Sequence, residues 1–193
     1  WSLLQNNYSL LGADLTLNII GEFINMLNET TEGQHMELSW SNTNDWDISQ
    51  DDYFIMCTKK TSWYTCITPF RLGNMIANKH TIDENKFVEF GTNLGIAFQI
   101  RDDILNLTAD GKYGKEYAGD LIEGKRTLIL IHLLKSCNNS DREFIESFFN
   151  NNREFREGNY QQLLDLISKY KSLDYATNIC NELSEKALTE FNN

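Results

Sequence analysis

The sequence is poor in residues that interrupt helices and shows no regular strand pattern. Among its 193 residues there is one proline, Pro69, and no continuous stretch in which apolar and polar residues strictly alternate. Proline interrupts helices because it lacks a backbone N–H, and strict alternation is the pattern of a half-buried strand. With 41% hydrophobic and 12% aromatic residues, the chain is also too apolar to be disordered. We therefore expect one folded, mainly helical domain.

Positive charge is also scarce. The 17 Lys and Arg residues are outnumbered by 28 Asp and Glu residues, which gives a formal net charge of −11. Nonspecific binding to nucleic acid or to an anionic membrane needs a basic surface, so this balance argues against both. Any phosphate site must then be built locally, from a few lysines or from metal ions.

The cysteines and histidines form no recognisable metal or redox motif. Cys57, Cys66, Cys137 and Cys180 show no CxxC spacing, and the three histidines complete no zinc signature. We predict reduced thiols in a cytoplasmic protein. There is no cationic leader and no stretch of about 18 apolar residues, so we expect no membrane span. The first residue is Trp1 rather than methionine, from which we expect a processed, truncated or partial chain.

Apolar residues recur at helical spacing through most of the chain. The first predicted helix covers residues 10–27 and ends at a break over residues 30–33. A segment over residues 34–40 either continues it or stands alone. Further helices are predicted at residues 49–67, 71–77 after a bend or restart at Pro69, 81–107, 127–134, from 140 to a break at Gly158 and Asn159, 160–170, and 173–191. Three pairs have capping-box spacing: Ser49 and Asp52, Thr81 and Glu84, Ser140 and Glu143.

Two adjacent carboxylates, Asp102 and Asp103, lie in the middle of a strongly apolar segment. At about 100° per residue, Gln99 lies one turn before both, and Asn106 lies one turn after Asp102. These four residues share a polar patch on a helix that is otherwise apolar, and therefore buried. Because unpartnered buried carboxylates are costly, they must pair with Arg101 or a lysine of another helix, be protonated, or face a cavity that holds cations. Mg²⁺ suits the last alternative, since one or two carboxylates and substrate phosphates typically hold it.

A loop rich in glycine and lysine follows at residues 112–127. Its glycines let backbone N–H groups approach an anion closely, and Lys115, Lys125 and Arg126 supply positive charge. Asp120 and Glu123 either hold these lysines or bind a further metal ion through water. Alone, such a loop is usually just solvated. Because this loop directly follows the acidic patch around Asp102 and Asp103, we expect it to form the second half of a site for metal ions and diphosphate.

Two smaller polar elements lie upstream. Lys60 and Thr61 belong to a segment that otherwise looks buried, although a plain surface lysine is the alternative interpretation. Gln34 and Glu37 are three residues apart, so they share one face of a helix.

The combination of these elements resembles the trans-isoprenyl diphosphate synthases. The run from Phe98 to Asn106, with its two aspartates, is similar to that family's second aspartate-rich region. Details of this run and of the later Glu-Gly-Lys-Arg-Thr segment look more like geranylgeranyl or longer polyprenyl synthases than farnesyl enzymes. Four elements carry the resemblance, in this order: Gly33-Gln34 with Glu37 in place of the family's aspartate, Lys60-Thr61, Phe98 to Asn106, and Gly114 to Thr127.

The resemblance implies an all-α helical bundle of the isoprenoid synthase type around a deep cavity. It also implies Mg²⁺-dependent condensation of isopentenyl diphosphate with an allylic prenyl diphosphate. The implied metal ligands are Asp102, Asp103 and Asp120; the implied catalytic residues are Asp102, Asp103, Lys60 and Gln99; the implied substrate-binding residues are Gln34, Lys60, Thr61, Lys115 and Lys125. The residue types agree with this chemistry, since a departing diphosphate needs metal ions and cationic donors.

One motif of the family has no counterpart in the chain. A first aspartate-rich motif faces the second in that family, whereas the other Asp pair here, Asp51 and Asp52, lies at an expected helix N-terminus and suits the helix dipole. We therefore expect residues 1–193 to be a single partial domain, the C-terminal half of a bundle without its N-terminal helices. Such a half would expose apolar helix faces and need a homodimer or another chain for activity.

Two other functions stay open. One is a noncatalytic helical partner that regulates a full-length prenyl synthase, although such a scaffold has no chemical need for the acidic patch and its lysines. A terpene cyclase shares the magnesium and diphosphate chemistry but gives no reason for a lysine-rich loop that holds a second diphosphate.

Overall fold

The structure is a computed structural model that describes residues 2–78, 83, 85, 87–108 and 117–192. Every regular element within these ranges is a helix, as the sequence predicts. The elements are α1 (Ser2–Leu11), α2 (Ala13–Asn42), α3 (Gln50–Cys57), the π-helix η1 (Thr58–Ile67), α4 (Thr68–Asn78), α5 (Val88–Thr108), α6 (Gly119–Glu123), α7 (Leu128–Ser136), α8 (Asn139–Asn150), α9 (Arg153–Lys169) and α10 (Ser172–Asn192).

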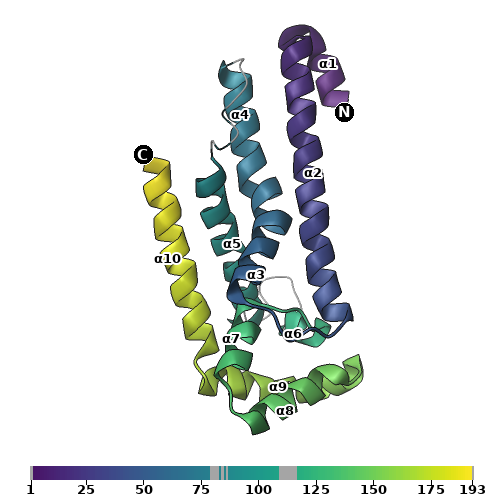
Figure 1. The fold of residues 1–193 in the computed structure, drawn as a ribbon, viewed down its shortest axis with the longest axis vertical. Coiled ribbons are helices and arrows are strands. Elements are labelled where there is room, and N and C mark those ends of the chain that lie inside the picture. Colours follow the sequence, from purple (N-terminus) through teal and green to yellow (C-terminus); the bar gives the residue numbers. More distant parts are fainter. Residues whose placement is uncertain (1, 79–82, 84, 86, 109–116, 193) are drawn as a thin grey trace.

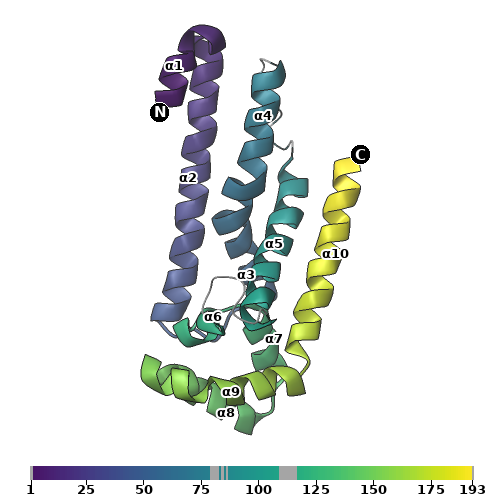
Figure 2. The same cartoon turned by 180° about the vertical axis from the view of Figure 1, so that it is seen from behind.

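The long helices form one layer. The helix α2, the continuous rod of α3, η1 and α4, then α5 and finally α10 lie side by side in that order (Figures 1 and 2). The short helix α1 folds back along the first turns of α2. The helices α6 to α9 gather at one end of the layer, where α8 and α9 run across it. The second half of the chain thereby closes one end of the layer.

Glycines allow the central helices to approach one another closely. A Cβ atom on Gly33 of α2 would lie 2.3 Å from the backbone N of Lys60, and one on Gly95 of α5 would lie 2.2 Å from Ser62 Oγ. Real Cβ atoms do not reach such distances, so η1 is held between α2 and α5 at separations that only glycine permits. This packing fixes the backbone of Lys60 and its neighbours.

The main core lies where α5, α7, α8, α9 and α10 meet. Leu128, Ile129, Leu130 and Leu133 of α7 are fully buried, which confirms the buried helix predicted at residues 127–134. Thr127 caps this helix by accepting a hydrogen bond from the backbone N–H of Leu130.

Several predicted helix boundaries are confirmed. Ser49 and Asp52 make both hydrogen bonds of a capping box at the start of α3. The last helix runs from Ser172 to Asn192, close to the predicted range. The segment at residues 34–40 continues the first long helix, so the predicted break at residues 30–33 is wrong.

Other boundaries differ because asparagines provide the caps. Asn138, rather than the predicted Ser140, caps α8 by accepting from the N–H of Asp141. The predicted break at Gly158 and Asn159 is wrong, because α9 begins after the cap Asn152 and runs through both residues. A glycine inside a helix lowers the stability of that helix by only about 1 kcal/mol relative to alanine. The packing of the buried α9 residues Leu163 and Ile167 offsets this loss. The helix α5 begins at Val88, later than predicted, and the pair Thr81 and Glu84 lies outside the described residues.

Two other expectations concern the thiols and the membrane. All four cysteines are free thiols, as predicted. Within the described ranges, no helix combines the length and the apolar character needed to cross a membrane.

Candidate active site

Asp103 is the buried member of the acidic pair on α5. It is 5% exposed, whereas Asp102 is half-buried. Tyr53 of α3 donates from Oη to Asp103 Oδ2 at 2.7 Å, and Gln99 donates from Nε2 to Oδ1 at 2.9 Å. Burial, with smaller contributions from the charges of Asp120 and Asp102, raises the pKa of Asp103 to about 7 in spite of these hydrogen bonds. The buried carboxylate thus receives hydrogen bonds from two neutral groups.

Thr61 extends this hydrogen-bonded chain to η1. It is 2% exposed, and its Oγ1 donates to Gln99 Oε1 at 2.8 Å. The amide of Gln99 therefore accepts on one side and donates to Asp103 on the other. A continuous line of hydrogen bonds joins η1, α5 and α3.

Lys60 and Thr61 lie on a π-helix, and such segments occur frequently at functional sites. Pro69 follows as the second residue of α4 and lacks the N–H that would bond to the carbonyl of Thr65 in a regular α-helix. The wider π turn and the close contact with Gly33 together determine where the Lys60 side chain leaves the backbone.

Lys60 forms an ion pair with Glu37 of α2. Its Nζ atom lies 2.6 and 2.7 Å from the two Glu37 carboxylate oxygens, and Gln34 donates to Glu37 at 3.3 Å. The two charged side chains are only 22% and 12% exposed, so this lysine is not a freely solvated surface residue. The pair joins the Gln34 element to η1.

Asn106 and Lys125 connect α5 to α6 and the turn after it. The Asn106 side chain, 6% exposed, accepts from the backbone N–H of Asp120 at 3.1 Å. Lys125 Nζ lies 2.6 Å from Asp120 Oδ1 and 3.2 Å from Glu123 Oε2. Burial opposes the charge of Lys125, but its hydrogen bonds to these acids raise its pKa above the ordinary value. Here the acids hold the lysine, which was one of the two predicted alternatives. Lys115 lies outside the described residues.

The donor set suits Mg²⁺ in kind. Asp102, Asp103 and Asp120 supply carboxylate oxygens, and their negative charges reinforce one another, which contributes to the raised pKa of Asp103. A nearby cation would relieve this repulsion. Within the described part of the chain, no three His, Cys, Asp or Glu residues lie close enough to hold an ion by themselves. Proteins commonly hold Mg²⁺ with only one or two carboxylates, completed by water and substrate phosphates.

Sequence reasoning missed Tyr53. The capping box placed it in the first turn of a helix, but nothing in the pattern relates it to Asp103, 50 residues further along the chain. The tyrosine is 1% exposed, and burial raises its pKa well above the ordinary value. It therefore stays protonated as a hydrogen-bond donor.

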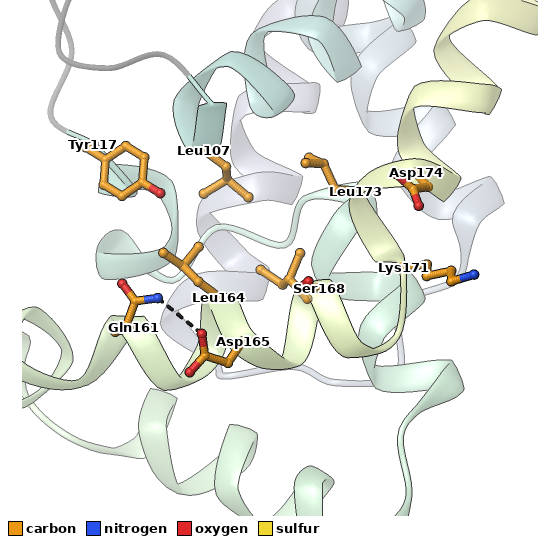
Figure 3. A pocket seen from close by; sticks show the side chains of 10 residues that line it. Leu107, Tyr117, Gln161, Leu164, Asp165, Ser168, Lys171, Leu173 and Asp174 are labelled. Atoms are coloured by element: carbon orange, nitrogen blue, oxygen red, sulfur yellow. Dashed lines mark hydrogen bonds between the residues drawn. The ribbon is translucent and has the colours of Figure 1, made fainter.

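Two pockets in the described part of the chain lie outside the group of candidate residues. One of about 350 Å³ lies beyond Leu107, at the end of α5, with Tyr117 and residues of α9 and α10 around it. Figure 3 shows the hydrogen bond from Gln161 to Asp165 on its α9 wall. A second, apolar pocket of about 400 Å³ lies between α1, α2 and α4. None of the candidate residues lines either pocket.

Comparison with known proteins identifies the family. A family model described as polyprenyl synthetase matches residues 2–167. The chain belongs to the polyprenyl synthetase family. This confirms the resemblance on which the site was predicted.

Curated relatives of this family member are longer proteins. The geranylgeranyl diphosphate synthase of Sulfolobus acidocaldarius is 35% identical over 163 residues, which are 84% of this chain and 48% of that protein. The octaprenyl diphosphate synthase of Haemophilus influenzae is 29% identical over 174 residues, which are 90% of this chain and 51% of that protein. The chain spans about half the length of the curated relatives it matches.

Solved structures share the fold. The geranylgeranyl pyrophosphate synthetase of Pyrococcus horikoshii matches with a TM-score of 0.75 and 28% identity, over 91% of this chain and 52% of that one. A geranylgeranyl pyrophosphate synthase of Corynebacterium glutamicum, complexed with isoprenyl diphosphate and magnesium, matches with a TM-score of 0.81 and 23% identity, over 94% of this chain and 51% of that one. The predicted all-α fold is confirmed.

Proposed function

We propose that the chain carries part of the active site for prenyl chain elongation, the Mg²⁺-dependent condensation of isopentenyl diphosphate with an allylic prenyl diphosphate. The observation that supports this most strongly is a row of polar residues across three neighbouring helices, formed by two hydrogen-bonded groups that meet at the adjacent residues Lys60 and Thr61. It begins with Gln34, Glu37 and Lys60 and continues through Thr61, Gln99 and Asp103. Because the chain belongs to the polyprenyl synthetase family, we assign these residues to prenyl chain elongation.

Lys60 and Lys125 are the cations that bind diphosphate in this proposal. Each ammonium group lies 2.6 Å from a carboxylate, Glu37 for Lys60 and Asp120 for Lys125, and is thereby oriented before a substrate arrives. A diphosphate with several negative oxygens competes well for these donors. Gln34 donates a hydrogen bond to Glu37 and so helps to orient it. Lys115, which belongs to the same loop sequence as Lys125, would add a further positive charge.

Asp102 and Asp103 would hold Mg²⁺ together with water and diphosphate oxygens, and Asp120, which pairs with Lys125, would reach the ion through water. Bound there, the ion would neutralise charge that develops on the leaving diphosphate. Tyr53 and Gln99 orient the Asp103 carboxylate, and each of its oxygens keeps a second lone pair for another partner. Thr61 in turn fixes Gln99, so the acid that holds the ion cannot rotate freely.

We infer that elongation requires polypeptide beyond these 193 residues, whether from a longer form of the same chain, from a homodimer or from another chain. Two observations support this: the chain spans about half the length of its relatives, and its long helices expose large apolar side chains. Leu27, Leu38 and Phe98, for example, are 54%, 51% and 55% exposed.

The free thiols are compatible with a reducing compartment, which supports our proposal of a cytoplasmic location.

Calorimetric titration with inorganic diphosphate, with and without Mg²⁺, tests the site. We expect binding that depends on Mg²⁺ and that weakens about tenfold or more in Asp103→Asn, because a neutral amide replaces a negatively charged ligand of the ion. Glu89→Gln is the matched control, since it neutralises an exposed acid on the same helix. Equal affinity in Asp103→Asn and wild type would refute the metal role.

An elongation assay with isopentenyl and allylic diphosphates tests the need for completion. We expect no robust elongation by the chain alone. Full activity of the isolated chain contradicts that expectation. In an active reconstituted complex, unchanged activity after replacement of Asp102 and Asp103 by Asn would favour the noncatalytic partner instead.

A further inference from the structure

Arg126 is a buried arginine next to the candidate site that forms no ion pair with any residue that the structure describes. Arg126 is 3% exposed, and its guanidinium donates to the carbonyl of Asp45 at 2.9 Å, the carbonyl of Gly124 at 2.6 Å and Asn44 Oδ1 at 2.6 Å. The Cζ atom of this guanidinium group also lies 4.1 Å from the centre of the Trp46 ring. All these partners are neutral groups, so the positive charge is hydrogen-bonded but not neutralised.

A second arginine approaches the same point. Arg156 of α9 has a buried Nε atom with no hydrogen-bond partner. Its Nη1 lies 3.0 Å from the position that a Cβ atom would take on Gly124, and Arg126 Nη1 lies 3.7 Å from that position. The two guanidinium groups therefore meet above Gly124, where α6 packs against α9 (Figure 2).

The acids nearby do not balance these charges directly. Glu157, next to Arg156 in sequence, pairs with Arg153 at 2.6 Å. The Asp45 carboxylate accepts from the N–H of Asp47 at 2.9 Å and acts on Arg126 only through space. Burial lowers the pKa of Arg126 to about 10, with the charge of Arg156 adding to the effect. Burial and the charge of Arg153 lower the pKa of Arg156 as well.

This arrangement is unusual in a chain with 28 acidic residues and a net charge of −11. Two guanidinium groups that share a partly buried space repel each other, and an unsatisfied buried donor adds to the cost. Arg156 also lies near the N-terminus of α9, where the helix dipole disfavours a positive charge. An anion between the two groups would remove all three penalties.

We propose that Arg126 and Arg156 form a binding site for a small oxyanion of the phosphate class, separate from the candidate active site. Guanidinium groups suit such a ligand because their N–H groups match phosphate oxygens in pairs. Gly124 immediately precedes Lys125, so a bound anion would steady the turn that presents Lys125 to Asp120. This site goes beyond elongation and does not rest on it.

Titration with inorganic phosphate in the absence of Mg²⁺ tests the proposal. The ¹H–¹⁵N signal of the Arg156 Nε–H group should shift saturably as phosphate is added. In calorimetry, Arg156→Gln should weaken phosphate binding about tenfold or more, and Arg156→Lys should weaken it less, since it keeps the charge but loses the paired donors. The Arg156 side chain makes no hydrogen bond in the described part of the chain, so both variants should fold.

Lys186→Gln is the control, because it removes one positive charge from an exposed position on α10. It should leave the phosphate affinity unchanged. The proposal is overturned if the Arg156 signal does not shift, or if Arg156→Gln binds phosphate as tightly as wild type. Loss of binding in Lys60→Ala but not in Arg156→Gln would also overturn it, because the anion would then occupy the candidate active site.

Discussion

At the scale of single residues, the hydrogen bond from Tyr53 to Asp103 is the contact most open to a direct test. Tyr53→Phe removes the donor at 2.7 Å and leaves a buried carboxylate oxygen unsatisfied. We expect the free energy of unfolding to fall by about 1–3 kcal/mol, measured by urea denaturation. Because this hydrogen bond lowers the pKa of Asp103, its loss should also raise that pKa.

Tyr64→Phe is the matched control for this change. Tyr64 lies on η1 and is 50% exposed, so loss of its hydroxyl should leave stability nearly unchanged. Equal unfolding midpoints for Tyr53→Phe and Tyr64→Phe would show that the buried hydrogen bond contributes nothing.

A second residue-scale prediction concerns His132 and pH. Its ring is stacked on Tyr175 with centroids 4.1 Å apart, and burial lowers its pKa. The unfolded chain, in which histidine has a pKa of about 6.5, therefore takes up this proton at a higher pH than the folded chain. The stability that uncharged His132 contributes to the fold is fully present above the unfolded-state pKa of about 6.5. It is lost as the pH falls from there through the lower pKa of the folded state.

The measurement compares urea unfolding of wild type and His132→Gln at pH 8 and pH 5.5. Wild type should lose more unfolding free energy between the two pH values than the variant does. An equal loss in both proteins would mean that other groups, such as the carboxylates, account for the acid sensitivity.

At the scale of helices, the sequence predicted what depends on local pattern. Helical period alone placed Gln99 beside Asp103, and the capping box at Ser49 was correct because both of its hydrogen bonds are local. The contact of Tyr53 with Asp103 and the ion pair of Lys60 with Glu37 were not predictable, since each depends on how separate helices pack. No local signal specified the π-helix either.

The close packing of α2 on η1 gives the element-scale prediction. Gly33→Ala would place a Cβ atom 2.3 Å from the backbone N of Lys60. Backbone atoms cannot give way as a flexible side chain can, so the helices must separate. We expect a loss of about 1–3 kcal/mol in unfolding free energy. Weaker diphosphate binding should accompany it, because Lys60 moves with its backbone.

Gly21→Ala provides the control on the same helix. Gly21 is exposed, and a Cβ atom there would meet nothing within 4 Å. Its replacement should stabilise the protein by about 0.5–1 kcal/mol, because alanine has the higher helix propensity. If both variants changed stability in the same direction, close approach would not be the reason for glycine at position 33.

At the scale of the whole molecule, the layer of long helices leaves apolar side chains exposed on α2. Leu17, Ile24 and Leu38 are 65%, 50% and 51% exposed, and their spacing by sevens or multiples of seven places them on one face of the helix. Exposed apolar patches of this kind usually mark association surfaces. We therefore expect the mass measured by sedimentation equilibrium to rise with protein concentration.

The double variant Ile24→Lys with Leu38→Lys tests whether this face is responsible. Both side chains are half-exposed, so lysine should lower association without a large loss of stability. Gln162→Lys adds charge at an exposed polar position on a different helix, α9, and should leave association nearly unchanged. If wild type stays monomeric at all concentrations, the apolar face of α2 does not drive association. If the double variant associates as strongly as wild type, another surface is responsible, with Phe98 on α5 as the next apolar side chain to replace.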